Sequence, residues 1–262
     1  MADSRPPLKD KPLRNPGQSV REQRDDLLFD KLLSPMLIAV MLVLWAVMDW
    51  IRYFFPRPPQ PWITSLCAAL AIIYAVWQFG RHRPKIRMLK LAEEGEKAVG
   101  QHLERLRASG YAVFHDLVGT DFNVDHVIIG PAGVFTIETK TWNKPRQGNH
   151  RITFDGETLL AADYEPDRNP VIQAKAQASW LQRLLTESTG KTQPVRPVIL
   201  FPGWYIEDSR ASRKDLWVLE PKALAAFLAQ EQTRLTPEDV TLAAYHLSRF
   251  IRAQERAFDG MR

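Results

Sequence analysis

The chain has a single cysteine, Cys67, among 262 residues. One cysteine excludes a disulfide within the chain, and no cysteine and histidine residues recur at the spacing of a structural zinc site. The sequence also lacks the phosphate-binding motifs GxxxxGK(S/T) and GxGxxG and the GxSxG motif of serine hydrolases. These absences exclude a disulfide scaffold, leave P-loop nucleotide hydrolysis and serine chemistry without support, and favour a reducing compartment.

Acidic residues are fewer than basic residues, 30 against 35, and the formal net charge is +5. Such a chain is suited to nucleic acid or to an anionic membrane surface. Part of the excess lies in residues 1–34, which contain several prolines and few apolar side chains. Their basic residues are Arg5, Lys9, Lys11, Arg14, Arg21, Arg24 and Lys31. We predict a disordered basic arm over residues 1–34.

Two long apolar runs follow, residues 35–55 and 62–79, joined by a short proline-rich link. Each is close to the roughly 20 residues that a helix needs to cross a bilayer, and tryptophan and tyrosine gather toward their ends. Asp49 is the exception inside the first run, because an acid in hydrocarbon is unfavourable. The runs predict a two-helix transmembrane hairpin over residues 35–80; the alternative is a buried helical hairpin of a soluble domain.

The charges around these runs predict the topology. Basic residues precede the first run and follow the second, whereas the end of the first run and the link between the two runs contain only Arg52 and Arg57. By the positive-inside rule both termini, and the domain that follows, lie in the cytoplasm of a multi-pass protein of the inner (plasma) membrane. Lipid contact through residues 35–80 then explains much of the basic excess.

Residues 123–140, NVDHVIIGPAGVFTIETK, have the pattern of a β-hairpin: two runs of β-branched and aromatic residues flank a turn with proline and glycine. A turn centred between Pro131 and Ala132 pairs Ile129 with Val134. The same register sets Asp125 directly opposite Glu138. Because side chains alternate along a strand, Lys140 lies on the same face.

Directly opposed like charges destabilise a sheet, so the Asp125 and Glu138 pair needs compensation. Carboxylate oxygens suit Mg²⁺ or Mn²⁺, and Lys140 is placed to orient a water molecule. The alternative is a solvated sheet face on which charges happen to alternate. His126 lies on the opposite face and is interpreted as structural.

Two helices add polar residues to otherwise apolar stripes. Glu96 falls on the apolar stripe of a predicted helix over residues 86–107, next to Gly95, which allows close approach of another segment. Asn169 and Pro170 begin a second helix as cap and first helical residue. Gln173 and Gln177 lead its apolar stripe, which continues with Trp180, Leu181 and Leu184. Each polar residue has a plainer reading as well: a half-exposed flank position for Glu96 and a solvated helix start for Gln173.

Further along, residues 195–201 and 216–219 read as strands, and residues 221–231 and 237–256 as helices. The order of elements predicts an α/β fold, a mixed sheet flanked by helices. We place this domain at residues 86–220, with the C-terminal helices of residues 221–262 packed on it.

The segments EEGEKAV, NVDHVIIGPAGVFTIETKTW and NPVIQAKAQASWLQRLL together resemble the nuclease-related domain, NERD, over about residues 92–201. That family belongs to the PD-(D/E)xK nucleases, so the resemblance implies a restriction-endonuclease-like sheet. It implies Glu96, Asp125, Glu138, Lys140 and Gln173 as catalytic residues. It further implies that the three acids and the main-chain carbonyl of Thr139 hold Mg²⁺, with Mn²⁺ as a substitute.

The resulting hypothesis is a membrane-anchored, metal-dependent nuclease that hydrolyses phosphodiester bonds of cytoplasmic DNA or RNA, with DNA favoured. A second hypothesis is a catalytically silent, membrane-tethered protein that binds nucleic acid or acts as a scaffold with the same fold. A third is an accessory protein that forms homo-oligomers through its membrane hairpin.

Overall fold

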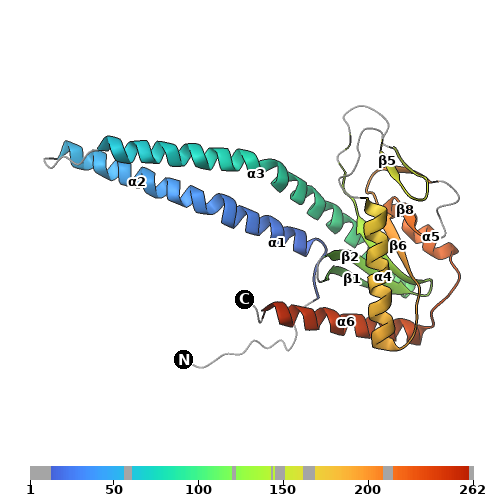
Figure 1. Ribbon diagram of the computed structural model, residues 1–262. Helices are drawn as coiled ribbons and strands as arrows, with labels where there is room; N and C mark the ends of the chain where they lie inside the picture. The colour runs from blue at the N-terminus through green and yellow to red at the C-terminus, as the bar shows by residue number, and fades with distance from the viewer. Residues whose placement is uncertain are drawn as a thin grey trace, which may run out of the picture. The chain divides into compact units, whose positions relative to one another are not determined.

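The computed structural model describes residues 13–55, 61–119, 122–142, 144, 151–161, 169–208 and 215–259 (Figure 1). The chain divides into two compact units. One comprises Met1–Gln18 together with Ala92–Arg262, and the other comprises Ser19–Leu91. The first unit is therefore built from two segments that are far apart in the sequence.

The unit Ser19–Leu91 is helical. It contains most of α1 (Gln18–Asp26), then η1 (Leu27–Leu33), α2 (Ser34–Phe54) and the first part of α3 (Pro61–Glu104). The indole N–H of Trp50 on α2 donates to the hydroxyl of Ser65 on α3 over 2.9 Å. Most large apolar side chains of α2 are exposed.

Helical structure begins earlier than the sequence predicted. The disordered arm was expected over residues 1–34, but residues 18–33 form α1 and η1. The prolines of this region end at Pro16, and the following residues include the good helix formers glutamine, glutamate, arginine and leucine. Residues 1–12 lie outside the described part of the chain.

The prediction of two transmembrane helices is wrong in number, because only one candidate is found. Within the described residues, a single helical stretch, Gln18–Phe54, is long and apolar enough to cross a membrane. Residues 62–79, expected as the second crossing, do not form a helix of their own. They are the first part of the 44-residue α3, which continues through Pro84 and its basic neighbours into the other unit.

The larger unit contains a five-stranded sheet in the order β1-β2-β3-β6-β8. Its strands are β1 (Ala112–Val118), β2 (Asn123–Gly130), β3 (Gly133–Thr139), β6 (Val195–Leu200) and β8 (Trp217–Leu219). Strands β1, β2 and β3 are antiparallel neighbours, whereas β3, β6 and β8 run parallel. The predicted mixed sheet is confirmed.

Helices cover both faces of this sheet, as the alternation of its side chains requires. Ile128 packs in one apolar cluster with Val99 and Leu103 of α3. The flanking Val127 and Ile129 belong to a second cluster, together with side chains of α4 (Pro170–Thr189) and α6 (Pro237–Asp259). The short α5 (Leu224–Gln230) joins the α3 side. The site described below forms where β2 and β3 meet α3 and α4.

A second, three-stranded sheet has the order β5-β4-β7. Its strands are β4 (Arg151–Phe154), β5 (Leu159–Ala161) and β7 (Tyr205–Asp208). β4 and β5 form an antiparallel hairpin, whereas β7 pairs with β4 in parallel. β7 comes directly after β6, so the second sheet is tied to the end of the main sheet at which β3 and β6 finish.

Candidate active site

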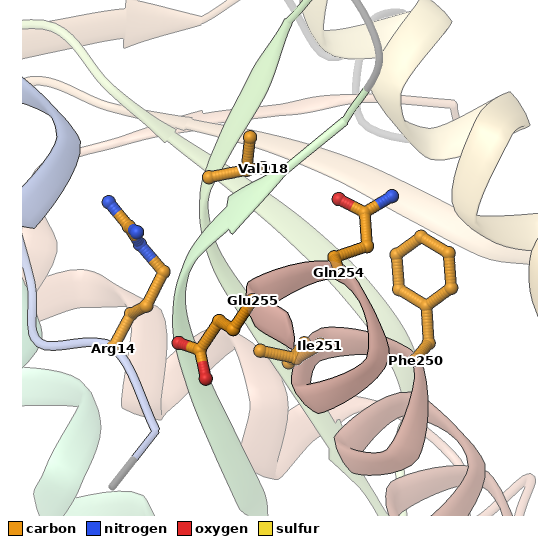
Figure 2. Close-up of a pocket in the computed structure, with 6 residues that line it drawn as sticks. All are labelled: Arg14, Val118, Phe250, Ile251, Gln254 and Glu255. Carbon is orange, nitrogen blue, oxygen red and sulfur yellow. The ribbon is translucent and has the colours of Figure 1, made fainter. Parts of the chain in front are cut away.

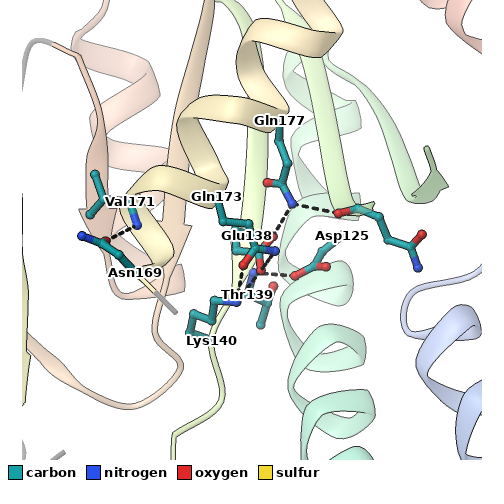
Figure 3. A network of polar contacts seen from close by, with 9 residues as sticks. Asp125, Glu138, Thr139, Lys140, Asn169, Val171, Gln173 and Gln177 are labelled. Carbon is teal, nitrogen blue, oxygen red and sulfur yellow. Dashed lines mark hydrogen bonds and ion pairs between the residues drawn. The ribbon is translucent and has the colours of Figure 1, made fainter. Parts of the chain in front are cut away.

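The β2–β3 hairpin has the register that its sequence predicted. Ile129 pairs with Val134, and the pairing continues to His126 and Ile137. One step further in this register, Asp125 and Glu138 face each other. The backbone N–H of Thr139 donates to the Asp125 carboxylate over 2.6 Å (Figure 3). This bond holds the Asp125 side chain against the end of β3.

Glu138 is the centre of a polar network (Figure 3). Its side chain is nearly inaccessible, with 3% of its surface exposed. Lys140 Nζ and Gln173 Nε2 donate to one carboxylate oxygen over 2.6 and 2.9 Å, and Gln177 Nε2 donates to the other over 2.7 Å. Lys140 Nζ also donates to Gln173 Oε1 over 3.1 Å. The buried charge of Glu138 is thus balanced by one cation and two amides.

Helix α4 supplies both amides because of the way it begins. The side chain of Asn169 accepts a hydrogen bond from the backbone N–H of Val171 over 2.9 Å, which caps the helix, and Pro170 is its first residue. Gln173 and Gln177 are four residues apart and therefore lie on one helix face. The start of this helix was predicted from the sequence.

Gln177 is a site residue that sequence reasoning did not assign. Its amide also donates to the carbonyl of Asn123, at the start of β2, over 2.8 Å. It thereby ties the hairpin to α4 through Glu138. The signal was present in the sequence as a second amide on the apolar stripe, but the resemblance led only to Gln173.

Glu96 reaches the site through a close approach of α3. A Cβ atom at Gly95 would lie 1.9 Å from the hydroxyl oxygen of Thr141, the residue after Lys140. Only glycine therefore lets α3 lie against the end of β3 in this way. The close contact expected at Gly95 is present, and it brings the next residue, Glu96, beside the carboxylates of the hairpin.

The acids influence one another electrostatically. Burial, followed by the charges of Asp116 and Glu138, raises the pKa of Glu96 to about 8, while a hydrogen bond from the Gly17 backbone and the charge of Lys140 act in the opposite direction. Burial, followed by the charges of Glu138 and Glu96, raises the pKa of Asp125 well above its ordinary value. Glu96, Asp125 and Glu138 therefore act as one electrostatic group.

Asp116 is a further acid that the sequence did not indicate. It lies in β1, only 1% of its surface is exposed, and its backbone φ is +52°, in the left-handed region. Arg14 donates to its carboxylate over 2.6 Å. The two residues are 102 positions apart, so no local pattern could have paired them.

The site offers the donor types that a hard divalent cation prefers, although the described side chains do not converge on one point. Three carboxylates that repel one another offer oxygen ligands, and a cation would relieve this repulsion. Among the buried oxygens without a hydrogen-bond partner in the described residues are Thr139 Oγ1 and Gln177 Oε1. A converging group of three or more histidine, cysteine, aspartate or glutamate side chains is not found in that part of the chain. Side-chain rearrangement around Glu138 would be needed to hold the ion.

His126 lies on the opposite sheet face from Asp125, as expected. It is completely buried, and its Nδ1 lies 2.9 Å from Nδ1 of His115. Burial lowers the pKa of both imidazoles. The pair is therefore neutral at pH 7. It links β1 to β2 and has a structural role.

Residues 91–202 match the family model described as nuclease-related domain, NERD. This stretch of the chain is similar to the nuclease-related domain. Every predicted site residue lies within the matched stretch of the NERD domain, whereas Arg14 and Gly17 lie outside it. The structure gathers the predicted residues around the ends of β2 and β3.

The comparison with solved structures found the structure of Pyrococcus furiosus SfsA in complex with Ca²⁺. It has 13% sequence identity and a TM-score of 0.24, and the match covers 53% of this chain and 55% of that chain. The chain thus spans about half the length of SfsA. A likeness at this level supports no conclusion about this chain. The search of curated proteins found no match.

Proposed function

We propose that the protein is a metal-dependent nuclease that hydrolyses phosphodiester bonds of DNA or RNA. The observation that carries this proposal is the network of Glu138, Lys140 and Gln173, with Asp125 bound to the neighbouring backbone, inside a NERD domain. A carboxylate near the end of β3 and a lysine just after this strand, faced by a second acid, are the arrangement expected of the PD-(D/E)xK fold that the sequence resembles.

In this proposal Glu96, Asp125 and Glu138 hold Mg²⁺ or Mn²⁺ together with the main-chain carbonyl of Thr139. When bound, the ion polarises the scissile phosphate and lowers the pKa of a coordinated water. Lys140 orients the attacking water and stabilises the negative charge that develops on the phosphate.

The remaining residues have positioning roles. Gln173 contacts both Lys140 and Glu138, so it fixes the distance between the lysine ammonium group and the glutamate carboxylate. Gln177 holds the second Glu138 oxygen and the start of β2. Side-chain amides stay neutral at physiological pH, so the hydrogen bonds that Gln173 and Gln177 donate do not change as their own protonation state would.

The proposal is tested by cleavage of labelled single- and double-stranded DNA and RNA by the full-length protein in detergent. We expect cutting with Mg²⁺ or Mn²⁺, no cutting in EDTA, and recovery when excess metal is returned, because the carboxylates need the ion to bring a phosphate close. We expect DNA to be cut faster than RNA. Cleavage that persists in EDTA would contradict the metal requirement.

A catalytically silent nucleic-acid-binding protein is the second candidate. The specific observation in its favour is that Glu138 is already satisfied by protein donors and that no converging metal group occurs among the described residues. It predicts nucleic-acid binding that EDTA leaves unchanged, together with no cleavage under any metal. Binding and cleavage measured on the same preparation separate the two functions.

We also propose that the protein is held at the inner (plasma) membrane through the apolar helical stretch Gln18–Phe54, with the residues before Gln18 and the NERD domain both on the cytoplasmic side. Support comes from the length and apolar composition of this helical stretch and from the exposed side chains of α2. Positively charged residues near the flanks favour the cytoplasmic side.

We expect the protein to sediment with membranes after alkaline carbonate and to be released by detergent. Met41→Lys with Leu44→Lys should weaken this retention, since a lysine side chain is far less favourable in the hydrocarbon of a bilayer than in water. Release of the wild-type protein by carbonate alone would contradict the anchor. A C-terminal reporter that is active only outside the cytoplasm would contradict the proposed location. The mass of the detergent-solubilised protein separately tests whether homo-oligomers form.

A further inference from the structure

The short segment of residues 13–17, here called the N-terminal strap, belongs to the same compact unit as Ala92–Arg262. Leu13 packs against the apolar cluster formed by β1, β2, α4 and α6. Figure 2 shows Arg14 beside Val118 of β1 and the C-terminal part of α6, around a small pocket. The strap is thus placed against the NERD domain although some 75 residues separate the two in sequence.

Arg14 links the strap to β1 through an ion pair. Its guanidinium donates to Asp116 over 2.6 Å, and 13% of the arginine side chain is exposed against 1% of the aspartate. In a charge pair this far from solvent, loss of one partner removes a close opposite charge from a buried group, which is strongly destabilising. The charge of Asp116 also raises the pKa of Glu96, and its effect is larger than that of Glu138.

Pro16 packs the strap against α3. A Cβ atom at Gly100 would lie 2.5 Å from Cγ of Pro16, a distance that real contacts do not show. Glycine is unfavourable inside a helix, so its presence at position 100 needs a reason. The reason is the proline ring, which fits only against a residue without a side chain.

Gly17 completes the contact with the site. Its backbone N–H donates to the carboxylate of Glu96 and favours the ionised form. Gly100 follows Glu96 by four residues, one helical turn, so Pro16 and Gly17 act on the same face of α3. Arg14, Pro16 and Gly17 therefore fix the strap at three separate points around Glu96.

We propose that the N-terminal strap is a positioning element of the active site that orients Glu96, and that the catalytic unit is discontinuous in sequence. This proposal rests on the nuclease function proposed above. Residues 91–202, which match the family model, then contain the acids and the lysine but not everything that holds them in place. A fragment that begins at Ala92 lacks the strap and should cleave less well than the full chain.

The sharpest test changes no charge. Gly100→Ala adds one methyl group beneath Pro16, whereas Gly80→Ala adds the same group on the same helix where nothing lies within 4 Å. In full-length protein we expect Gly100→Ala to lower kcat at least about tenfold with KM for nucleic acid within about twofold. Gly80→Ala should keep the wild-type values. Wild-type kcat in Gly100→Ala would overturn the proposal.

The second test removes the ion pair between Arg14 and Asp116. Arg14→Met should lower kcat to a similar extent, Arg14→Lys should restore most of it, and Arg21→Met, which removes an exposed charge from α1, should have no effect. If Arg14→Met does not fold, the double variant Arg14→Met, Asp116→Asn removes both charges of the pair together. A folded double variant with reduced kcat supports the proposal, and one with wild-type kcat overturns it.

Hydrogen exchange separates failure of the strap from failure of the nuclease function. We expect the Gly17 amide of the wild-type protein to be protected and to exchange at least about tenfold faster in Glu96→Ala, with Glu94→Gln as an exposed control. This readout needs neither metal nor cleavage. Equal exchange in wild type and Glu96→Ala would overturn the strap contact even if the protein proved an active nuclease, and protection in an inactive protein would retain the contact without the reaction.

Discussion

Glu138→Gln is expected to lower metal-dependent cleavage by about a thousandfold while leaving the protein folded. The substitution keeps the shape of the side chain but removes the charge that would bind the metal, and loss of one such electrostatic contact at a reaction centre costs on the order of 10²- to 10³-fold. A neutral amide also places an N–H group where three donors already converge. Lys140, Gln173 and Gln177 must then reorient.

The matched control is Glu187→Gln, which makes the same chemical change at an exposed position near the end of α4. Cleavage rates are compared at saturating Mg²⁺ or Mn²⁺, and circular dichroism shows whether the fold is kept. A folded Glu138→Gln protein that cuts as fast as wild type would remove Glu138 from the chemistry. Equal loss in the Glu187→Gln control would point to damage unrelated to the site.

Glu96→Gln is expected to stabilise the metal-free protein at alkaline pH by about 2–3 kcal/mol, and to change its stability little at pH 4.5. The folded-state pKa of Glu96 is raised from 4.5 to about 8, first by burial and then by neighbouring acids. Below pH 4.5 the carboxyl is protonated in both the folded and the unfolded state, so it contributes no difference. Between pH 4.5 and 8 the unfolded chain loses the proton while the folded chain keeps it.

The folded state binds more protons in that window, and the free energy of unfolding of the wild-type protein therefore falls as pH rises from 4.5 to 8. Above pH 8 the full cost of a buried carboxylate is present. Glutamine removes this cost because it stays neutral, and its carbonyl still accepts the hydrogen bond from Gly17. The expected gain is smaller than the whole pKa shift implies, since the new amide N–H group needs a partner of its own.

The measurement is thermal or denaturant unfolding of full-length protein in detergent and EDTA at pH 4.5, 6.5 and 8.5, with the exposed Glu94→Gln as control. A stabilisation that grows with pH supports the raised pKa. A constant difference at all three values, or destabilisation at pH 8.5, would show that Glu96 is ionised in the folded protein without metal. Saturating Mn²⁺ should reduce or reverse the advantage of the variant, because the metal stabilises the ionised wild-type site.

Local sequence patterns determined the parts of the site that depend on short-range geometry. The turn at Pro131 and Ala132 determined the hairpin register and hence the opposition of Asp125 and Glu138, because side chains alternate strictly along a strand. The capping pattern at Asn169 and Pro170 located the start of α4 and with it the face that carries Gln173. Such features arise from neighbouring residues, so one sequence is enough to predict them.

The same local reasoning failed for the helical unit. Apolar runs of nearly equal length predicted two crossings, but the second run is only the beginning of α3. The composition of the second run did not indicate that it shares one helix with the charged residues after it, because the extent of a helix also depends on the residues on both sides of the run. Residues 18–33 likewise became helical because helix formers follow the last proline of the arm.

Tertiary structure alone decided the contacts between distant residues. Gln177 reaches Glu138 and Asn123 across the α4–sheet interface, and Arg14 reaches Asp116 from the far end of the chain. No helical or strand period links such pairs, because packing brings them together and burial makes their pairing necessary. The sequence by itself therefore determined which residues were candidates for the proposed chemistry, and the tertiary structure decided which others hold them in position.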